Sequence, residues 1–75
     1  MPNKLPAIQG IEVLRVLLKL GFEIKKKRRG SHLILRKNSL RVIVPMHTNK
    51  IIPKGTLLAI LRQAKISKKE FLELL

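Results

Sequence analysis

The chain is short and strongly basic. Its 75 residues carry 17 lysines and arginines against 4 acidic residues, which gives a formal net charge of +13 at pH 7. Because a chain of this charge repels itself, an anionic partner such as a nucleic acid or an acidic protein is expected. The absence of cysteine excludes disulfides and thiolate chemistry, and the apolar runs fall far short of the roughly 20 residues that span a bilayer. We therefore expect one small domain over residues 1–75, cytoplasmic and without membrane association.

The first predicted element is an amphipathic helix that opens at Gly10 and stops at Gly21. Apolar residues recur along this segment at helical spacing, and charged residues take the opposite face. The apolar positions are Val13, Leu14, Leu17 and Leu18, and the charged ones are Glu12, Arg15 and Lys19. Glycine adopts the left-handed conformation without steric cost, so Gly21 is a natural end for this helix.

Three antiparallel strands in a meander are predicted next. The first begins at Phe22 and runs into the basic residues, the second spans His32 to Lys37, and the third spans Leu40 to Val44. Turns are expected at Arg29 to Ser31, around Gly30, and at Asn38 and Ser39, because glycine, asparagine and serine favour turns. Pro45 ends the third strand, since proline cannot donate a hydrogen bond to a sheet ladder.

The last part of the chain predicts a polar loop and two helical pieces. The loop, Met46 to Gly55, carries His47, Lys50 and Lys54, and Thr56 is placed as the N-cap of a helix through Ala64. Ser67 with Glu70 three residues later is a capping-box signature that opens a final short helix. The predicted fold class is α+β, with the order αβββα and with the helices on one face of a three-stranded antiparallel sheet.

Alternation along the strands predicts which side chains share a face of this sheet. We expect the helices to cover Phe22, Ile24, Leu33, Leu35, Val42 and Val44. The open face then carries Lys25, Lys27, His32, Ile34, Arg36, Arg41 and Ile43. A histidine and several cations would line one surface, with Ile34 and Ile43 as an apolar spot beside them. A slip of one residue would invert every side chain.

The run KKKRRGSH, Lys25 to His32, sets a group able to transfer protons beside a site for polyanions. Metal-free RNA cleavage requires a base for the 2′-hydroxyl, an acid for the leaving oxygen, and cations for the phosphate. His32 suits the proton transfer and the basic run suits the phosphate. Four glutamates spread along the chain, no aspartate and only two histidines disfavour a metal site.

Each of these features has a structural alternative. His32 in that case orders the hairpin as a hydrogen-bonded turn residue, His47 bonds the backbone of its loop, and the basic run is a solvated face. The only aromatic side chains are Phe22 and Phe71, both at positions that suit a core. Base-stacking readers of single strands use exposed aromatic residues, so contacts to phosphate and shape with modest sequence preference are expected.

Five motifs stand in an ordered series along the chain. They are Gly21-Phe22, Gly30-Ser31-His32, Val44-Pro45-Met46-His47, Gly55-Thr56-Leu57 and Ile60-Leu61-Arg62-Gln63-Ala64. In this order the sequence resembles the HicA family of messenger-RNA interferase toxins over nearly its whole length. The resemblance implies a fold like that of double-stranded-RNA-binding domains and a ribonuclease activity that depends on His32. It also implies neutralisation by a HicB-type antitoxin in a type II toxin-antitoxin system.

The leading hypothesis is therefore a metal-independent endoribonuclease that cleaves mRNA, with no cofactor. His32 is the expected catalytic acid or base, and His47 is the second choice as proton donor. The expected RNA contacts are Lys25, Lys27, Arg28, Arg29, Ser31, Lys50 and Lys54, and no direct DNA binding is expected. Two alternatives stay open: a non-catalytic RNA-binding module of the same fold, and a purely structural partner of an acidic protein.

Overall fold

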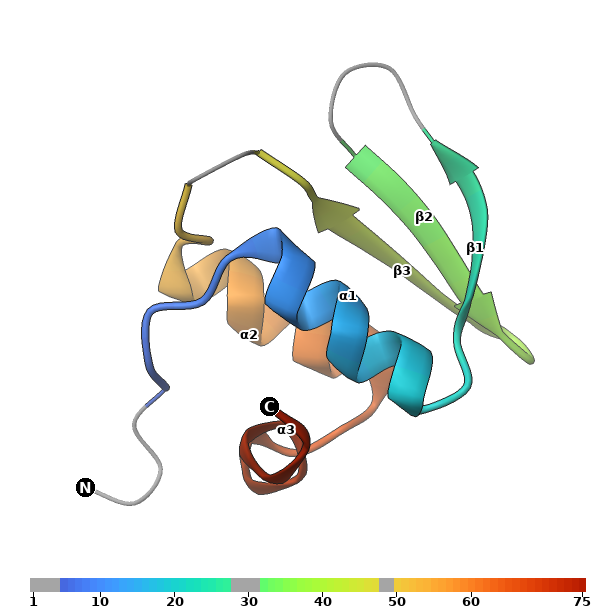
Figure 1. Cartoon of the computed structure of the whole chain (residues 1–75). Helices are drawn as coiled ribbons and strands as arrows, with labels where there is room; N and C mark the ends of the chain where they lie inside the picture. The colour runs from blue at the N-terminus through green and yellow to red at the C-terminus, as the bar shows by residue number, and fades with distance from the viewer. Residues whose placement is uncertain (1–4, 28–31, 48–49) are drawn as a thin grey trace.

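The computed structural model contains an open three-stranded antiparallel sheet and three helices, and it describes residues 5–27, 32–47 and 50–75 (Figure 1). In chain order the elements are α1 (Gly10–Lys19), β1 (Glu23–Lys27), β2 (His32–Lys37), β3 (Leu40–Pro45), α2 (Lys54–Ala64) and α3 (Lys68–Leu74). The strands lie in the order β1-β2-β3, which confirms the predicted α+β class and the αβββα plan. Within the described residues, no helix has the length and hydrophobicity needed to cross a membrane.

Helix α1 begins and ends as the sequence predicts. At its start the backbone N–H of Gln9 donates a hydrogen bond of 2.8 Å to Oε2 of Glu12. This bond satisfies a backbone N–H that has no acceptor within the helix. At its end Gly21 takes a φ of 97°, and the N–H of Phe22 reaches back to the carbonyl of Leu17 at 3.0 Å. This geometry needs a residue without a side chain, so Gly21 directs the chain into β1.

The tight turn between β2 and β3 sets the register of that hairpin. Asn38 has a φ of 55°, a conformation that asparagine adopts more readily than most residues. Lys37 and Leu40 are opposite each other on either side of the turn. The ladder continues without a break until His32 lies opposite Pro45. The turn thus fixes which residue of β3 stands beside the histidine.

β1 departs from the predicted alternation in two ways. A register shift between Ile24 and Lys26 places Lys26 opposite Ile34 and Lys27 opposite Leu33. Lys27 was predicted to lie on the same face of the sheet as His32, but its register position pairs it with Leu33, so this prediction is wrong. A bulge of this kind inserts one extra residue and reverses the alternation beyond it. Ile24 pairs with Leu35 on the helix side, yet its side chain is 48% exposed. The expectation that the helices cover Ile24 is therefore also wrong.

The hydrophobic core lies between one face of the sheet and the three helices. The sheet contributes Leu35, Val42 and Val44, and fully buried partners come from every helix, among them Val13, Leu17, Leu57, Ile60 and Phe71. Ile34 is an exception, because it is only 7% exposed but lies outside this core. It stands opposite the half-buried Ile43 on the other face of the sheet. The expected apolar spot therefore exists on the open face.

The two C-terminal helices begin at different kinds of residue. α2 starts at Lys54, after Pro53, and the N–H of Leu57 donates to the carbonyl of Pro53 at 2.9 Å. The expected N-cap at Thr56 is therefore wrong: this residue lies inside the first turn, because the helix opens directly after the proline. The N-cap of α3 is Ser67, whose Oγ accepts a hydrogen bond of 3.0 Å from the N–H of Glu70, as the sequence predicts.

Candidate active site at the start of β2

His32 is the first residue of β2 and is half-buried. It alternates with Leu33, whose side chain packs against the core, so its own side chain lies on the open face of the sheet. Pro45 is its neighbour across the ladder. His47 follows Pro45 by two residues and is exposed. Strand pairing alone therefore brings the segment that carries the second histidine to the first.

The segment after β3 is held in place from the side of α1. The N–H of Ile52 donates to the carbonyl of Ile8 at 2.7 Å, and an isolated bridge joins Gln9 to Ile51. The side chain of Ile52 is buried in the core. Gly10 lies so close to β3 that a side chain there would collide with the carbonyl oxygen of Pro45. These contacts hold Pro45 and Ile52, which lie before and after His47 in the sequence.

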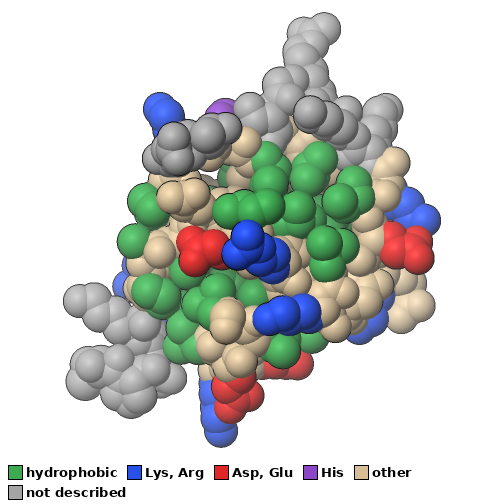
Figure 2. Space-filling model, viewed as in Figure 1, with side chains coloured by type: hydrophobic (Ala, Val, Ile, Leu, Met, Phe, Trp, Pro, Cys, Tyr) green, Lys and Arg blue, Asp and Glu red, His purple; other side chains and the backbone are tan. Residues whose placement is uncertain are grey.

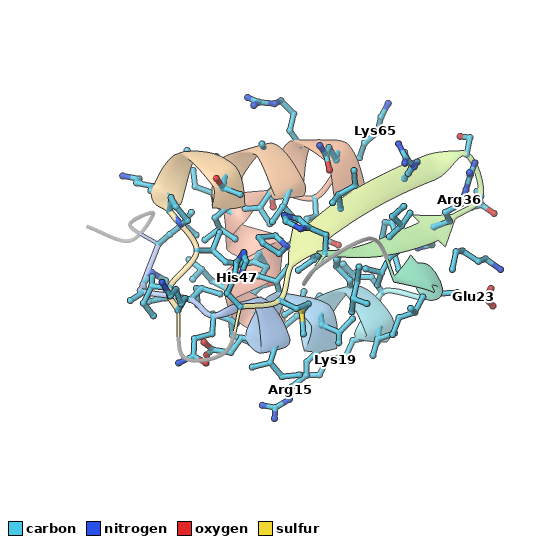
Figure 3. The ribbon with its side chains drawn as sticks, turned by 90° about the horizontal axis from the view of Figure 1, so that it is seen from above. Arg15, Lys19, Glu23, Arg36, His47 and Lys65 are labelled. Atoms are coloured by element: carbon cyan, nitrogen blue, oxygen red, sulfur yellow. The ribbon has the colours of Figure 1, made fainter. Side chains whose placement is uncertain are left out.

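The two histidine rings contact each other edge to face. Their centroids are 5.7 Å apart and their planes are at 87°. Figure 3 shows His47 at one end of the sheet, with Glu23 and Arg36 at the other. A pair of imidazoles at this spacing has the groups needed to remove one proton and to deliver another. The chain contains no other histidine.

A cavity of about 370 Å³ opens beside the histidine pair. Its lining comes from β2, the end of β3, the following loop and the first turn of α2: His32, Pro45, His47, Lys50, Ile51, Ile52, Pro53 and Thr56. Ligand cavities in proteins span roughly 300–1,000 Å³, so this one has room for a small part of a polymer such as one nucleotide. The cavity thus places two histidines, which can transfer protons, beside the cation of Lys50 and the apolar side chain of Ile51.

The electrostatics of the cavity favour an anion. Pro53 and Thr56 place the N-terminal end of α2 at its edge, where free backbone N–H groups and the helix dipole attract negative charge. The first turn of α2 contains no acidic residue to neutralise that end. Lys50 lines the cavity, and the exposed Lys54 begins the helix. Among the described residues, no three histidine, aspartate or glutamate side chains gather to hold a metal ion.

The residues predicted to contact RNA do not all lie at the histidine cavity. Lys25 donates a hydrogen bond of 2.8 Å to Glu23, and this bond with its charge lowers the pKa of the Glu23 carboxyl below its ordinary value. Lys25 shares a surface hollow with Arg36 and Asn38 at the end of the hairpin away from His32. Arg28, Arg29 and Ser31, and the expected turn around Gly30, lie outside the described residues, as does the side chain of Lys27.

The open face carries two further cations in line with the histidine. Arg36 and Arg41 are opposite each other in the ladder, and both are exposed. Ile34 and Ile43 stand between this arginine pair and His32. At the edge of the sheet, Oε1 of Gln63 in α2 accepts a hydrogen bond of 3.3 Å from the N–H of Ile43. Helix α2 thereby gives a hydrogen-bond partner to a backbone N–H that an edge strand would leave unpaired.

Sequence reasoning missed the contribution of Ile51 and Thr56 to the cavity and the direct contact between the histidines. A signal for that contact was present in the two-residue turn at Asn38 and Ser39. Such a turn fixes which residues of its two strands are paired. When this pairing is extended along the two strands, Pro45 lies opposite His32. The position of Ile51 and Thr56 depends on how the loop folds back, which no local pattern indicates.

Comparison with known proteins agrees with these observations. The model of the family described as HicA toxin of bacterial toxin-antitoxin matches residues 10–66. This range begins at α1, includes the whole sheet and both histidines, and ends after α2. A search of curated proteins found no match. Since the family model covers most of the 75 residues, the chain belongs to the HicA family of toxins from bacterial toxin-antitoxin systems.

Proposed function

We propose that this toxin is a metal-independent endoribonuclease that cleaves mRNA and so stops translation in the cytoplasm. The observation that carries the proposal is the contact of His32 with His47, 5.7 Å between ring centroids, at a cavity that also holds Lys50. General acid–base catalysis by such groups contributes about 10²–10⁴-fold in rate. The membership of the chain in a toxin family supports a role that damages an essential cellular component.

In the proposed reaction, one histidine in its neutral form takes the proton of a ribose 2′-hydroxyl. The 2′-oxygen then forms a bond to the adjacent phosphorus, and the bond from phosphorus to the 5′-oxygen of the next nucleotide breaks. The other histidine, in its protonated form, gives its proton to that leaving oxygen. The products are a 2′,3′-cyclic phosphate and a free 5′-hydroxyl. Atoms and charges balance without a metal or an external reductant.

The two histidines differ in how readily they can move. His32 is half-buried within a paired strand, whereas His47 is exposed on the segment after β3. The attacking and leaving oxygens lie on opposite sides of the phosphorus, so the rings must separate to reach both. We infer that His32 is the fixed partner and that His47 turns aside when the phosphate enters.

The charges around the cavity support binding of the RNA backbone. Lys50 and the N-terminal end of α2 suit the phosphate at the reacting centre, and negative charge develops there during the reaction. Arg36 and Arg41 extend the cationic surface along the open face. Ile51 offers an apolar wall for a base. Because both phenylalanines are buried in the core, base stacking on aromatic rings is not part of the proposal, and sequence preference should be modest.

A HicB-type antitoxin is the proposed protein partner. Membership of a toxin-antitoxin family implies that an antitoxin exists, and the net charge of +13 favours an acidic one. Such a protein would compete electrostatically with RNA for the cationic surfaces of the toxin. The HicB type is inferred from the resemblance of the sequence to HicA toxins.

The function is tested with a short RNA that carries a single 2′-deoxy nucleotide at the cleavage site. The all-ribose oligonucleotide should be cut in the presence of EDTA and leave a cyclic phosphate, which mass spectrometry identifies. The 2′-deoxy oligonucleotide should bind equally well but resist cleavage, because the attacking oxygen is missing. Efficient cleavage of the 2′-deoxy site would contradict attack by the 2′-hydroxyl. Salt-dependent binding without turnover would instead support the non-catalytic RNA-binding module.

A further inference from the structure

The open face of the sheet carries two arginines directly opposite each other. Arg36 of β2 pairs with Arg41 of β3 in the ladder, and both side chains are exposed. Directly opposed residues have Cβ atoms roughly 4.5–5.5 Å apart, so two like charges in these positions destabilise a sheet. Glu23 of β1 stands opposite Arg36, but its carboxylate accepts a hydrogen bond of 2.8 Å from Lys25. The described part of the chain therefore provides no salt bridge to either arginine.

The open face differs in charge from the opposite side of the molecule. On the side that α1 occupies, acidic and basic side chains lie close together among hydrophobic ones (Figure 2). Arg15 of α1, for example, shares a hollow with Glu12. The side chains that β2 and β3 place on the open face are His32, Ile34 and Arg36, and opposite them Pro45, Ile43 and Arg41. These two strands thus give the open face cations and apolar groups but no carboxylate.

The arginine pair lies at a defined distance from the histidine cavity. His32 and Arg36 are both in β2, and at roughly 3.3 Å per residue they are about 13 Å apart. Figure 3 shows His47 and Arg36 at opposite ends of the sheet. Phosphates follow one another about every 3.4 Å along a stacked strand and are further apart in an extended one. The distance from the cavity to the arginine pair therefore corresponds to about two to four nucleotides.

An apolar strip separates the cavity from the arginine pair. Ile34 is only 7% exposed and stands opposite the half-buried Ile43. A sugar or a base can rest against these side chains, whereas a phosphate there would lose hydration without meeting a cation of β2 or β3. A polyanion that crosses this strip is therefore held at its two ends. One end is the cavity with Lys50, and the other is the arginine pair.

We propose that the open face is the track for a single RNA strand, and that Arg36 and Arg41 together bind one phosphate about two to four nucleotides from the cleaved bond. Two guanidinium groups can hold one phosphate through charge-assisted hydrogen bonds, and the phosphate offsets their mutual repulsion. The strand is unpaired at the cavity, which has room for about one nucleotide. This inference rests on the proposed function, because it places the cleaved bond at His32 and His47. A dinucleotide, which cannot reach the arginine pair, should be a poor substrate.

The test neutralises one phosphate of the RNA at a time. The short 2′-deoxy oligonucleotide, which binds without being cleaved, is made as a series with a single methylphosphonate at each position in turn. Fluorescence anisotropy measures its affinity for the full-length toxin, for Lys50→Ala and for Arg36→Gln/Arg41→Gln. The matched control is Arg15→Gln/Lys69→Gln, which removes two exposed cations from α1 and α3. Circular dichroism and urea unfolding verify that each variant is folded.

The parent toxin should lose about tenfold in affinity when the methylphosphonate stands at either of two positions, as expected for a lost charge-assisted contact. Lys50→Ala should be insensitive at one of these positions. Arg36→Gln/Arg41→Gln should be insensitive at the other, about two to four nucleotides away, and the control should remain sensitive at both. The track is overturned if the arginine variant is as sensitive as the parent at every position, or if the control loses the same sensitivity.

Two further outcomes separate this inference from its alternatives. If Arg36→Gln/Arg41→Gln binds RNA as the parent does but loses affinity for the antitoxin, the arginine pair contacts protein and the track is overturned. If the parent leaves the all-ribose oligonucleotide intact, the proposed cleavage is wrong, yet the pattern of two sensitive positions still supports the track. If the parent cleaves that oligonucleotide but shows sensitivity only at the position assigned to Lys50, the proposed function stands and the track is overturned.

Discussion

His32 and His47 lie with their rings edge to face, 5.7 Å apart, although one begins β2 and the other follows β3. Two features of the chain produce this contact. The tight turn at Asn38 and Ser39 sets His32 opposite Pro45, and hydrogen bonding of Ile52 to Ile8 holds the segment that follows. A histidine that only ordered the hairpin would not need a second histidine against its open side. The contact therefore supports the proposal that the two histidines act together.

The first prediction concerns His47. His47→Asn keeps a side chain that forms hydrogen bonds but cannot take up and release a proton near neutral pH. We expect the single-turnover cleavage rate of a model RNA to fall about 10²–10⁴-fold. The affinity for the 2′-deoxy analogue, measured by fluorescence anisotropy, should stay within about twofold, since only transition-state interactions are lost. A rate equal to that of the parent would remove His47 from the mechanism.

The histidine pair should also behave as one unit. Combining His47→Asn with His32→Ala is expected to cost little more than the His32 substitution alone, because residues that act together have strongly non-additive effects. Single-turnover rates of the two single variants and the double variant form the cycle that measures this coupling. Rate losses that simply multiply would mean that the two rings act independently.

Lys50, between β3 and α2, and Lys25, in β1, offer a matched pair of lysines for a test of RNA binding. Lys50 lines the cavity, whereas Lys25 is hydrogen-bonded to Glu23. Lys50→Ala should reduce the slope of log affinity against log salt by about 0.7, the value for one phosphate contact on a single strand. Lys25→Ala should leave the slope unchanged. Anisotropy titrations at several salt concentrations measure both, and equal slopes for the two variants would refute the assignment of Lys50.

Two glycines test how the cavity is supported. A methyl group at Gly10 would collide with the carbonyl oxygen of Pro45, whereas Gly55 has open space around it. Gly10→Ala is expected to lower the free energy of unfolding by about 1–3 kcal/mol. It should also slow cleavage, because it displaces the strand end that leads to His47. Gly55→Ala should raise that free energy by up to about 1 kcal/mol. Urea titrations monitored by circular dichroism measure both, and equal effects would contradict the close packing of Gly10.

The backbone conformation at the C-terminal end of α2 predicts that a substitution of Lys65 stabilises the fold. Lys65 has a φ of 59°, and the N–H of Ile66 bonds the carbonyl of Leu61 at 3.1 Å. A lysine is strained in this left-handed conformation, which glycine adopts freely. Lys65→Gly should raise the free energy of unfolding by about 0.5–1 kcal/mol. Arg62→Gly, inside the same helix, should lower it by about 1 kcal/mol. A destabilised Lys65→Gly protein would mean that contacts of the lysine outweigh its strain.

Much of the fold follows from local sequence signals. Gly21 ends α1 because only a residue without a side chain suits its φ, and Ser67 opens α3 through its hydrogen bond to Glu70. Periodicity correctly placed Phe22, Leu35, Val42 and Val44 in the core. The fold class could be predicted because these signals agree with one another.

The errors arise where tertiary structure overrides the local pattern. Alternation alone cannot reveal the bulge in β1, which depends on how this strand pairs with β2, so the position of Lys27 was missed. Ile24 was expected to be buried, but its exposure depends on where the helices cross the sheet. Thr56 is a good N-cap residue, yet the helix starts earlier because Pro53 already accepts the first hydrogen bond.

The sequence indicated residues of the candidate site but not how they come together. The sequence indicated His32 as the proton-transfer group and placed Lys50 and His47 in a loop. It did not bring these residues together, because their meeting depends on the bonds from Ile8 and Gln9 to the segment before α2. Lys25 seemed equivalent to the other cations in the run, and only the structure reveals its pairing with Glu23.

The most direct test of the central claim is the cleavage of a model RNA by His32→Ala in the presence of EDTA. The variant should keep the circular dichroism spectrum and the unfolding midpoint of the parent, since the side chain of His32 is only half-buried on the open face. We predict that its cleavage activity is abolished while the parent continues to cut without metal. If the folded variant cleaves RNA as fast as the parent, His32 is not a catalytic residue and the account is wrong.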